Sequence, residues 1–303
     1  MRVEPNKSLR TSWSRTQESL TGLALVMPAL LLIAAFTIYP GIMTLVHGWM
    51  STPTGIKASR FVGLAQYKAL SQDPVFRQVL GNNILYALGS VPASVAIALG
   101  MALLTHARLP GRALSRLAFF TPTMLPLVAI ANIWLFIFTP GYGLLDAALH
   151  IIHVPEHNWL GEPQTVLLAL VLVAIWAQSG FFMIFYLAAL QNIPNHLLEA
   201  AAVEGANGWQ RFWRVTWPLL GPTTLFVVVN ATINAFSRVD MVFSLTQGGP
   251  DNASSLILYY IYQTSFQYWD TNYAAAMTSV LAALLAGVAA LQFALAGRRT
   301  HYQ

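Results

Sequence analysis

The chain has 303 residues, of which 56% are hydrophobic and 9% are charged. Soluble domains carry about 25% charged residues, so this composition excludes an ordinary water-exposed surface and indicates a helical membrane protein. The absence of cysteine excludes disulfide bonds, thiolate metal sites and cysteine nucleophiles. The formal net charge of +5 is compatible with nucleic-acid binding. Membrane topology accounts better for the basic residues, so we expect no nucleic-acid partner.

Six apolar runs have the roughly 20 residues that a helix needs to cross a bilayer. They predict an all-α, polytopic membrane protein with spans at 20–48, 80–106, 116–138, 166–190, 222–245 and 274–296. The first run exceeds the core of a cleavable signal peptide, which indicates a retained signal anchor. We therefore expect a single transmembrane domain at 20–297, a cytoplasmic N-terminal segment at 1–19 and a cytoplasmic tail at 298–303.

Prolines inside the first three spans predict kinks or local unwinding, because proline removes a helix hydrogen bond. Neighbouring helices can satisfy the carbonyl groups that such a kink frees. The prolines are Pro28, Pro40, Pro92, Pro122 and Pro126.

The lysines and arginines of the loops predict the orientation, because cytoplasmic loops carry an excess of them. With the N-terminus inside, eleven fall on the cytoplasmic side: Arg2, Lys7, Arg10, Arg15, Arg108, Arg112, Arg116, Arg211, Arg214, Arg298 and Arg299. Four fall outside, all in one loop: Lys57, Arg60, Lys68 and Arg77. The sequence therefore predicts that both termini are cytoplasmic.

The polar segment 191–221, between the fourth and fifth spans, predicts a helical hairpin on the cytoplasmic side. Asn195 is a candidate cap for a short helix at 196–203. Gly205 then permits a sharp reversal, because glycine adopts positive φ without steric cost. A second short helix at 209–215 is expected to end before Pro218. From the residues alone, such a hairpin either anchors two spans in the membrane interface or docks a partner.

The hairpin carries the run Glu199-Ala200-Ala201-Ala202-Val203-Glu204-Gly205-Ala206, followed by Phe212 and Pro218. At this spacing it resembles the EAA loop of ABC importer permeases, whose pattern is E-A-A-x-x-D-G-A. The resemblance implies that the loop couples the membrane pore to a cytoplasmic ATPase. Two positions depart from the pattern: Glu204 replaces the usual aspartate, and Trp217 replaces a leucine. Neither change removes a needed chemical group.

Further stretches make nearly the whole chain similar to carbohydrate-uptake permeases, the family of the maltose and glycerol-3-phosphate permease subunits. They include Tyr39-Pro40, Gly141-Tyr142-Gly143-Leu144-Leu145, Trp159-Leu160-Gly161 and Leu245-Thr246-x-Gly248-Gly249-Pro250. The resemblance implies a type I ABC importer permease fold in a bacterial cytoplasmic (inner) membrane. It implies three kinds of partner besides membrane lipid: a second homologous permease, two ATP-binding subunits and an extracytoplasmic solute-binding protein. ATP and Mg would bind the ATPase, so we expect no enzymatic activity and no cofactor on this chain.

The resemblance also assigns the residues that would contact the ATPase. Glu199 would make a charged contact in a cleft of that subunit, small alanines would allow close approach, and Gly205 would set the turn. The predicted coupling residues are Glu199, Ala200, Ala201, Glu204, Gly205, Ala206 and Phe212.

A polar stripe in the fifth span predicts a solute pathway, because ionisable residues inside spans usually face a cavity or the bundle interior. Amides, hydroxyls and aromatic rings suit a hydroxylated ligand, and an arginine suits a phosphate. The predicted pathway residues are Asn230, Asn234, Phe236, Ser237, Arg238, Asp240, Phe181 and Tyr186. Two alternatives remain for Arg238: a pair with Asp240, which needs local distortion because residues two apart face different sides of a helix, or snorkelling to the interface.

Other classes of function have weaker support. A stand-alone secondary transporter or channel is the main alternative, although the halves of the chain show no convincing internal repeat. A membrane-embedded enzyme would need clustered catalytic residues, and we expect none. The histidines lack metal-ligand helix spacing, and no phosphate-cradling Gly-Lys motif occurs, so we expect no metal site and no ATPase on this chain.

Overall fold

The computed structural model of the chain describes residues 21–53, 58–107, 111–153 and 155–297. The predicted cytoplasmic segment at 1–19, the tail at 298–303 and most of the basic residues assigned to the inside lie outside these ranges. Within the described ranges the chain is all-α, as predicted, and its only extended pairing is an isolated bridge between Met50 and Phe61.

The described helices follow the chain order of the predicted spans, with short helices in the connections. The first half contains the π-turn η1 (Ala34–Ile38), α2 (Tyr39–His47), α3 (Ala65–Gln72), α4 (Pro74–His106), α5 (Arg112–Met124), α6 (Leu127–Ile137) and α7 (Leu144–His150). The middle contains α8 (Val166–Gln191), α9 (Asn195–Val203), α10 (Gly208–Arg211), the π-turn η2 (Phe212–Thr216) and α11 (Trp217–Leu219). The last part contains α12 (Gly221–Phe236), α13 (Asp240–Leu245), α14 (Ile257–Tyr262), the π-turn η3 (Gln263–Gln267) and α15 (Thr271–Gly297).

Four described helices are long and apolar enough to cross a membrane: Thr21–His47, Pro74–His106, Val166–Gln191 and Thr271–Leu295. Two bent helix pairs raise the number to six if each pair is one span. The predicted boundaries agree closely for the fourth and sixth spans. The second helix starts at Pro74 rather than at residue 80, because the Asp73 side chain accepts the Val75 amide at 2.8 Å and caps it.

The predicted third span is not one continuous helix. Its two halves, α5 and α6, meet at an angle of 101°. The break falls at Leu125, directly before Pro126, where a residue preceding proline favours extended backbone. The predicted kink at Pro126 is therefore confirmed, whereas Pro92 and Pro122 lie inside helices that continue past them.

The predicted fifth span at 222–245 is also wrong in its boundaries. The apolar helix pair runs from Gly208 to Phe236 with a bend of 66° between α11 and α12. Beyond Phe236 the chain leaves the helix at 237–239 and begins the separate helix α13. Asn234 and Ser237 lie near this point. The side chains of asparagine and serine can form hydrogen bonds with the nearby backbone that compete with helical hydrogen bonds.

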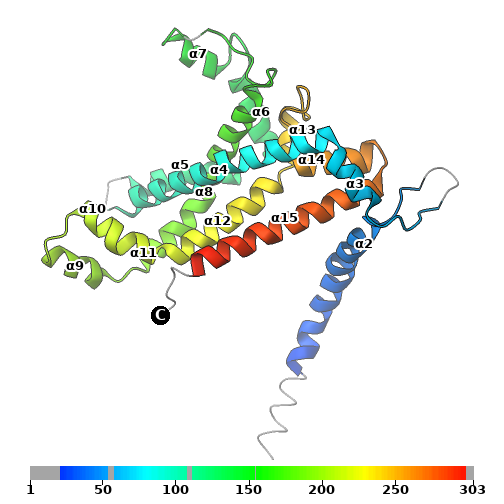
Figure 1. Cartoon of the computed structure of the whole chain (residues 1–303). Helices are drawn as coiled ribbons and strands as arrows, with labels where there is room; N and C mark the ends of the chain where they lie inside the picture. Colours follow the sequence, from blue (N-terminus) through cyan, green and yellow to red (C-terminus); the bar gives the residue numbers. More distant parts are fainter. Residues whose placement is uncertain (1–20, 54–57, 108–110, 154, 298–303) are drawn as a thin grey trace, which may run out of the picture.

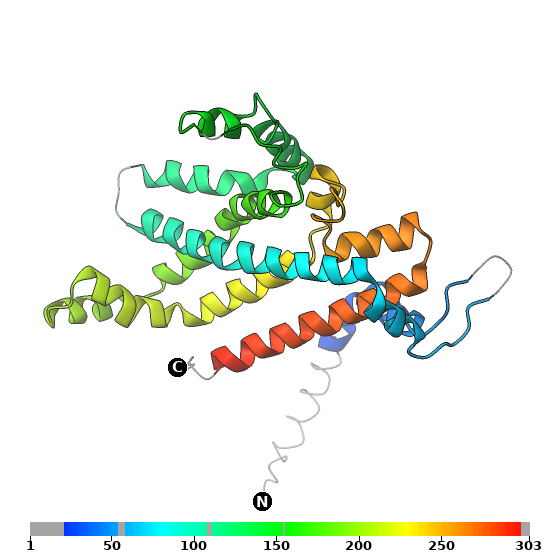
Figure 2. The same cartoon turned by 45° about the horizontal axis from the view of Figure 1, so that its top comes forward.

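The helices α4, α12 and α15 run side by side through the centre, and α8 crosses behind them (Figures 1 and 2). Buried apolar residues of α4, α8 and α12 form much of the core, including Tyr86, Phe182, Val227 and Ala231. Close approach of α5 to α8 depends on Gly180, where an added Cβ would overlap the Phe119 carbonyl oxygen. The N-terminal helix Thr21–His47 stands apart, and its most apolar window has no buried residue (Figure 1).

Candidate coupling hairpin and solute site

The predicted hairpin is formed by α9, a turn at 204–207 and α10. It projects from one end of the bundle, the end at which α4 and α15 also finish (Figures 1 and 2). Asn195 lies inside α9, and Pro194 takes the capping position without a side-chain hydrogen bond, so the predicted asparagine cap is wrong.

The turn of the hairpin is fixed by hydrogen bonds between near neighbours. Gly205 has φ +84°, as predicted. The Gly205 amide donates to the Ala202 carbonyl at 3.0 Å, and the Ala206 amide donates to the Ala201 carbonyl at 2.9 Å. These two bonds form a Schellman motif, which satisfies the free carbonyls at the end of α9.

The second arm of the hairpin begins with a complete capping box. The Asn207 side chain accepts the Gln210 amide at 2.9 Å, and the Gln210 side chain accepts the Asn207 amide at 2.9 Å. Further along, the Trp217 amide bonds to the Phe212 carbonyl, five residues back, and forms η2. Pro218 follows immediately and supplies no amide donor, which favours this wider turn. Pro218 lies within α11, and the helical stretch runs from Gly208 to Leu219, so the predicted end of the second helix before Pro218 is wrong.

The hairpin exposes both acidic and apolar side chains. Glu199 and Glu204 are exposed, and within the described residues neither makes an ion pair or a side-chain hydrogen bond. Val203 is 89% exposed and Trp209 is 71% exposed. Ala200 is exposed, and Ala201 and Ala206 are half-buried. A polar loop with apolar side chains this exposed has the composition of a surface that binds another protein.

Phe212 lies where the hairpin joins the bundle. It is half-buried and stacks edge-on with Trp213, with ring centres 5.2 Å apart. Phe212, Trp213 and Trp217 form one wall of an apolar groove of about 550 Å³, and residues of α4 from Val91 to Leu103 form the other wall. Of the seven predicted coupling residues, Phe212 is the one that lines this groove.

A second cavity, of about 490 Å³, lies inside the bend between α5 and α6. Three of the predicted pathway residues line it: Phe181 from α8, Asn234 from α12 and Arg238 from the break after α12. The remaining lining residues are Pro122, Thr123, Leu125, Pro126, Leu127, Ile130, Ala177 and Gln178. We call this cavity, whose role in solute binding is a proposal, the solute cavity. Gln178 of α8 was absent from the predicted pathway residues, and the signal that could have found it is its position three residues before Phe181 on the same helix.

The other predicted pathway residues lie elsewhere. Phe236 and Tyr186 are buried in the core, at 4% and 0% exposure. Asn230 is half-buried, and its side chain donates to the Phe226 carbonyl at 2.9 Å. Ser237 is exposed. The Asp240 carboxylate accepts the Met241 amide at 2.9 Å at the start of α13.

Arg238 has no ion-pair partner among the described residues, where the only ion pair is His157–Glu162. The alternative of an Arg238–Asp240 pair is therefore not realised within 4.0 Å. Arg238 is half-buried and makes no hydrogen bond in the described part of the chain, so its guanidinium presents unused donors at the solute cavity. A guanidinium in this setting favours carboxylate, sulfonate or phosphate groups.

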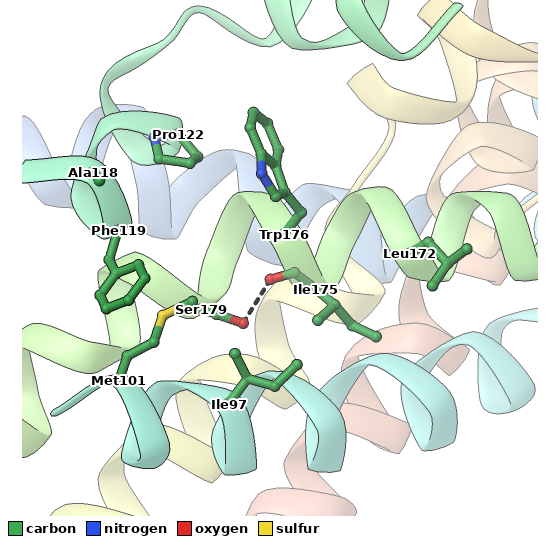
Figure 3. A pocket seen from close by; sticks show the side chains of 9 residues that line it. All are labelled: Ile97, Met101, Ala118, Phe119, Pro122, Leu172, Ile175, Trp176 and Ser179. Atoms are coloured by element: carbon green, nitrogen blue, oxygen red, sulfur yellow. Dashed lines mark hydrogen bonds between the residues drawn. The ribbon is translucent and has the colours of Figure 1, made fainter. Parts of the chain in front are cut away.

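The opposite side of α8 faces a smaller, apolar hollow of about 280 Å³ (Figure 3). Trp176 and Ser179 line it, together with Phe119 and Pro122 of α5. The Ser179 hydroxyl donates to the Ile175 carbonyl at 2.6 Å, so its donor is already used (Figure 3). Residues of α8 therefore divide between two hollows: Trp176 and Ser179 line the apolar one, and Gln178 and Phe181 line the solute cavity.

The loop that follows α6 is organised around one buried carboxylate, Asp146 of α7. It accepts hydrogen bonds from the Gly141 amide at 3.1 Å and from the Trp159 indole at 3.0 Å. Burial opposes ionisation of Asp146, but the bonds from Trp159 and Gly141 outweigh it and hold the pKa of the carboxyl below its ordinary value. Asp146 thus joins two parts of the loop at 139–165 to each other, the turn at Gly141 and the segment at Trp159.

A bundle of apolar helices with a polar cavity and a projecting hairpin defines a multi-pass membrane transport protein. Residues 90–301 match the family described as "Binding-protein-dependent transport system inner membrane component". Because the match covers more than half of the chain, the chain belongs to this family. The predicted relationship to carbohydrate-type ABC importer permeases of the inner membrane is thereby confirmed.

Individual relatives agree along almost the full length. The chain is 33% identical over 283 residues to the lactose transport system permease protein of Rhizobium radiobacter, covering 92% of this chain and 94% of that protein. It is 30% identical over 279 residues to an sn-glycerol-3-phosphate transport system permease protein of Agrobacterium fabrum, covering 92% and 95%. A solved structure of a bacterial alginate ABC transporter with its alginate-bound periplasmic protein has a TM-score of 0.83 at 20% identity, covering 94% and 97%. This likeness confirms the predicted permease fold.

Proposed function

We propose that this chain is the transmembrane subunit of an ABC importer that moves a sugar or related polyol across the cytoplasmic membrane. The hairpin α9–α10 docks in a partner ATPase, where ATP and Mg bind, and transmits the movement of that subunit to the membrane helices. A second permease subunit, two ATP-binding subunits and an extracytoplasmic binding protein complete the assembly. The chain itself holds no cofactor and catalyses no reaction.

The exposed hairpin carries this proposal. The Schellman motif fixes its turn, and the capping box fixes the start of its second arm. The loop is therefore stiff without contacts to the bundle. Its exposed surface combines Glu199 and Glu204 with Val203 and Trp209, none of which is covered by described residues. A stiff loop transmits a displacement without bending, which is the property that mechanical coupling requires.

The orientation follows from the same proposal. The hairpin, the end of α4, the start of α5 and the end of α15 lie at one end of the bundle (Figures 1 and 2). If the hairpin meets an ATPase, this end is cytoplasmic, in agreement with the arginines at 112, 116, 211 and 214. The N-terminal segment and the tail are then cytoplasmic as well.

The solute cavity supports a hydroxylated solute that carries an anionic group, similar to glycerol-3-phosphate. The amides of Gln178 and Asn234 offer donors and acceptors for hydroxyl groups, and the ring of Phe181 offers an apolar face. The unpaired Arg238 favours an anion. The relatives named above include permeases for a neutral sugar and for an anionic polyol, so the charge of the solute is a property of the particular chain.

The test of the coupling role is a charge reversal at Glu199. The complex is purified through a tag on this chain, placed in liposomes with its binding protein, and assayed for ATP hydrolysis. We expect Glu199→Lys to reduce the amount of ATPase that copurifies and to abolish solute-stimulated hydrolysis. Glu156→Lys, the same reversal at an exposed glutamate of the loop after α6, is the matched control and should leave copurification unchanged.

Two results would contradict the proposal. Full copurification and full stimulation in Glu199→Lys would remove the hairpin from the coupling mechanism. Transport that proceeds without any copurifying ATPase and without ATP would favour the alternative, a stand-alone secondary transporter or channel.

A further inference from the structure

The break after α12 positions the polar groups of the solute cavity. The backbone carbonyl groups that it leaves free need hydrogen-bond partners. A helix leaves its last carbonyl groups without intrahelical bonds. At the end of α12 the Ser237 amide satisfies the Asn234 carbonyl at 3.1 Å. The next carbonyl, that of Ala235, lies between Asn234 and Arg238 in the chain and is satisfied from another helix.

That partner is Asn83 of α4, whose exposure is 0%. Its side-chain amide donates to the Ala235 carbonyl at 3.3 Å. Its side-chain oxygen accepts the Ile257 amide at 3.1 Å, at the first residue of α14. One buried side chain thus satisfies the free carbonyl end of α12 and the free amide end of α14. An apolar side chain at this position leaves both groups unpaired.

The helix that carries Asn83 is itself held at its outer end. The Asp73 carboxylate caps α4 through the Val75 amide at 2.8 Å. It also accepts hydrogen bonds from the hydroxyls of Tyr260 and Tyr273, each at 2.9 Å. α4 is therefore tied to α14 and α15, and it is a fixed reference from which Asn83 reaches the break.

We propose that Asn83 is a positioning residue that holds the break at 237–239, and with it Asn234 and Arg238, in the geometry of the solute cavity. This inference rests on the proposed function of that cavity. It goes beyond it by assigning the geometry of the site to a residue that does not line the cavity.

Asn82, the neighbouring residue, provides a matched control. Its amide donates to the carbonyls of Asn252 and Ser255, at 2.8 and 3.2 Å, in the loop before α14. It makes no hydrogen bond to α12. Removing Asn82 therefore releases the loop alone, whereas removing Asn83 releases the start of α14 and the break together.

The natural absence of cysteine allows a direct test in the assembled complex in liposomes. Ser237, which is exposed and lies in the break, is replaced by cysteine and carries a nitroxide spin label. We expect Asn83→Ala to narrow the spectrum of the label, because the break moves more freely, and Asn82→Ala to leave it unchanged. If the alanine variant fails to assemble, Asn83→Leu takes its place, because leucine fills the space of the amide without forming its hydrogen bonds. We expect the same narrowing of the spectrum in Asn83→Leu. An unchanged spectrum in the Asn83 variants, or an equal change in Asn82→Ala, would overturn the proposal.

A second readout measures the electrostatic effect of the Arg238 charge inside the cavity. In Asn234→Cys, the rate of modification by an anionic methanethiosulfonate reagent is divided by the rate with a cationic one. We expect Arg238→Gln to lower this ratio several-fold, and Asn83→Ala to lower it as well. In the presence of Arg238→Gln, Asn83→Ala should have no further effect. If Arg238→Gln leaves the ratio unchanged, the proposed anion site fails, while the label at position 237 still decides the role of Asn83.

Discussion

The hairpin formed by α9 and α10 and the solute cavity are built in opposite ways. The hairpin consists of consecutive residues, and its fixing hydrogen bonds join groups no more than five residues apart. The solute cavity combines α5, α6, α8 and the end of α12, and two of its walls are helix breaks. Local hydrogen bonds are sufficient for the first region, whereas the second exists only when several helices are packed.

Because of this difference, we expect substitutions in the two regions to affect different properties, either binding of a partner or stability of the bundle. A substitution in the hairpin should change the contact with a partner while the bundle keeps its stability, because few hairpin side chains are buried. A substitution in the walls of the cavity should destabilise the bundle itself. Three substitutions, taken from the largest expected effect to the smallest, measure how far this separation holds.

The largest effect is expected at Gly180, where α8 and α5 touch beside both hollows. In Gly180→Ala the new Cβ would overlap the Phe119 carbonyl oxygen, so α5 has to move away from α8. Overpacking of this kind costs about 1–3 kcal/mol. We expect a lower thermal midpoint of the purified complex and a lower yield of folded protein.

Gly81→Ala in α4 is the matched control for this experiment. No atom lies within 4 Å of the position of its added Cβ. Alanine is favoured over glycine inside a helix by about 1 kcal/mol, so the control should be neutral or slightly stabilising. Equal midpoints for both variants would show that the α5–α8 contact does not limit the stability of the bundle.

The same contrast explains how much of the fold the sequence predicted. Continuous apolar runs gave the fourth and sixth spans almost to the residue, because nothing interrupts their helices. For the third span the sequence predicted a kink at Pro126 but not a bend of 101°, and for the fifth span it missed the break at 237–239. Hydropathy is an average over a window and continues through Leu125-Pro126 and through Ser237, whereas the helix depends on single backbone hydrogen bonds.

The residues of the candidate site also differ in how well the sequence predicted them. The reversal at Gly205 followed from the identity of one residue. For the cavity, the sequence named Asn234, Arg238 and Phe181, because polar and aromatic residues are conspicuous within an apolar span. It also named Phe236 and Tyr186, which are buried in the core, because a residue pattern does not give the rotation of a helix against its neighbours. Asn83 was missed entirely, since its importance comes from contacts with residues more than 150 positions away.

An intermediate effect is expected at Asp146, which joins the turn at Gly141 to Trp159 within the loop at 139–165. In Asp146→Asn one of the two donors, the Gly141 amide or the Trp159 indole, loses its acceptor, which costs about 1–3 kcal/mol for a buried group. We expect faster hydrogen exchange of the amides at 141–147 at neutral pH, with the bundle unaffected.

The pH dependence of this contribution has a definite sign. Since the folded loop lowers the pKa of Asp146 from its ordinary 3.8, the stabilisation is complete above that pH and disappears as the pH falls through the lower folded pKa. The exchange difference between wild type and Asp146→Asn should therefore be constant from pH 8 to about pH 5. A difference that grows on acidification would mean that the carboxylate is not the stabilising form.

The smallest effect is expected at Gly205, and it tests the autonomy of the hairpin. A side chain at φ +84° costs about 1–2 kcal/mol, since the left-handed region crowds Cβ against the carbonyl oxygen. Gly208→Ala is the matched control, because Gly208 also has open space around it but no positive φ. We expect Gly205→Ala, and not Gly208→Ala, to weaken binding of the proposed ATPase partner by roughly tenfold, which corresponds to about 1.4 kcal/mol.

The thermal midpoint of the membrane bundle should be the same in both variants, because the Schellman motif has no bond to the bundle. If Gly205→Ala lowers that midpoint as Gly180→Ala does, the hairpin is part of the cooperative core, and coupling and stability cannot be varied independently in this protein.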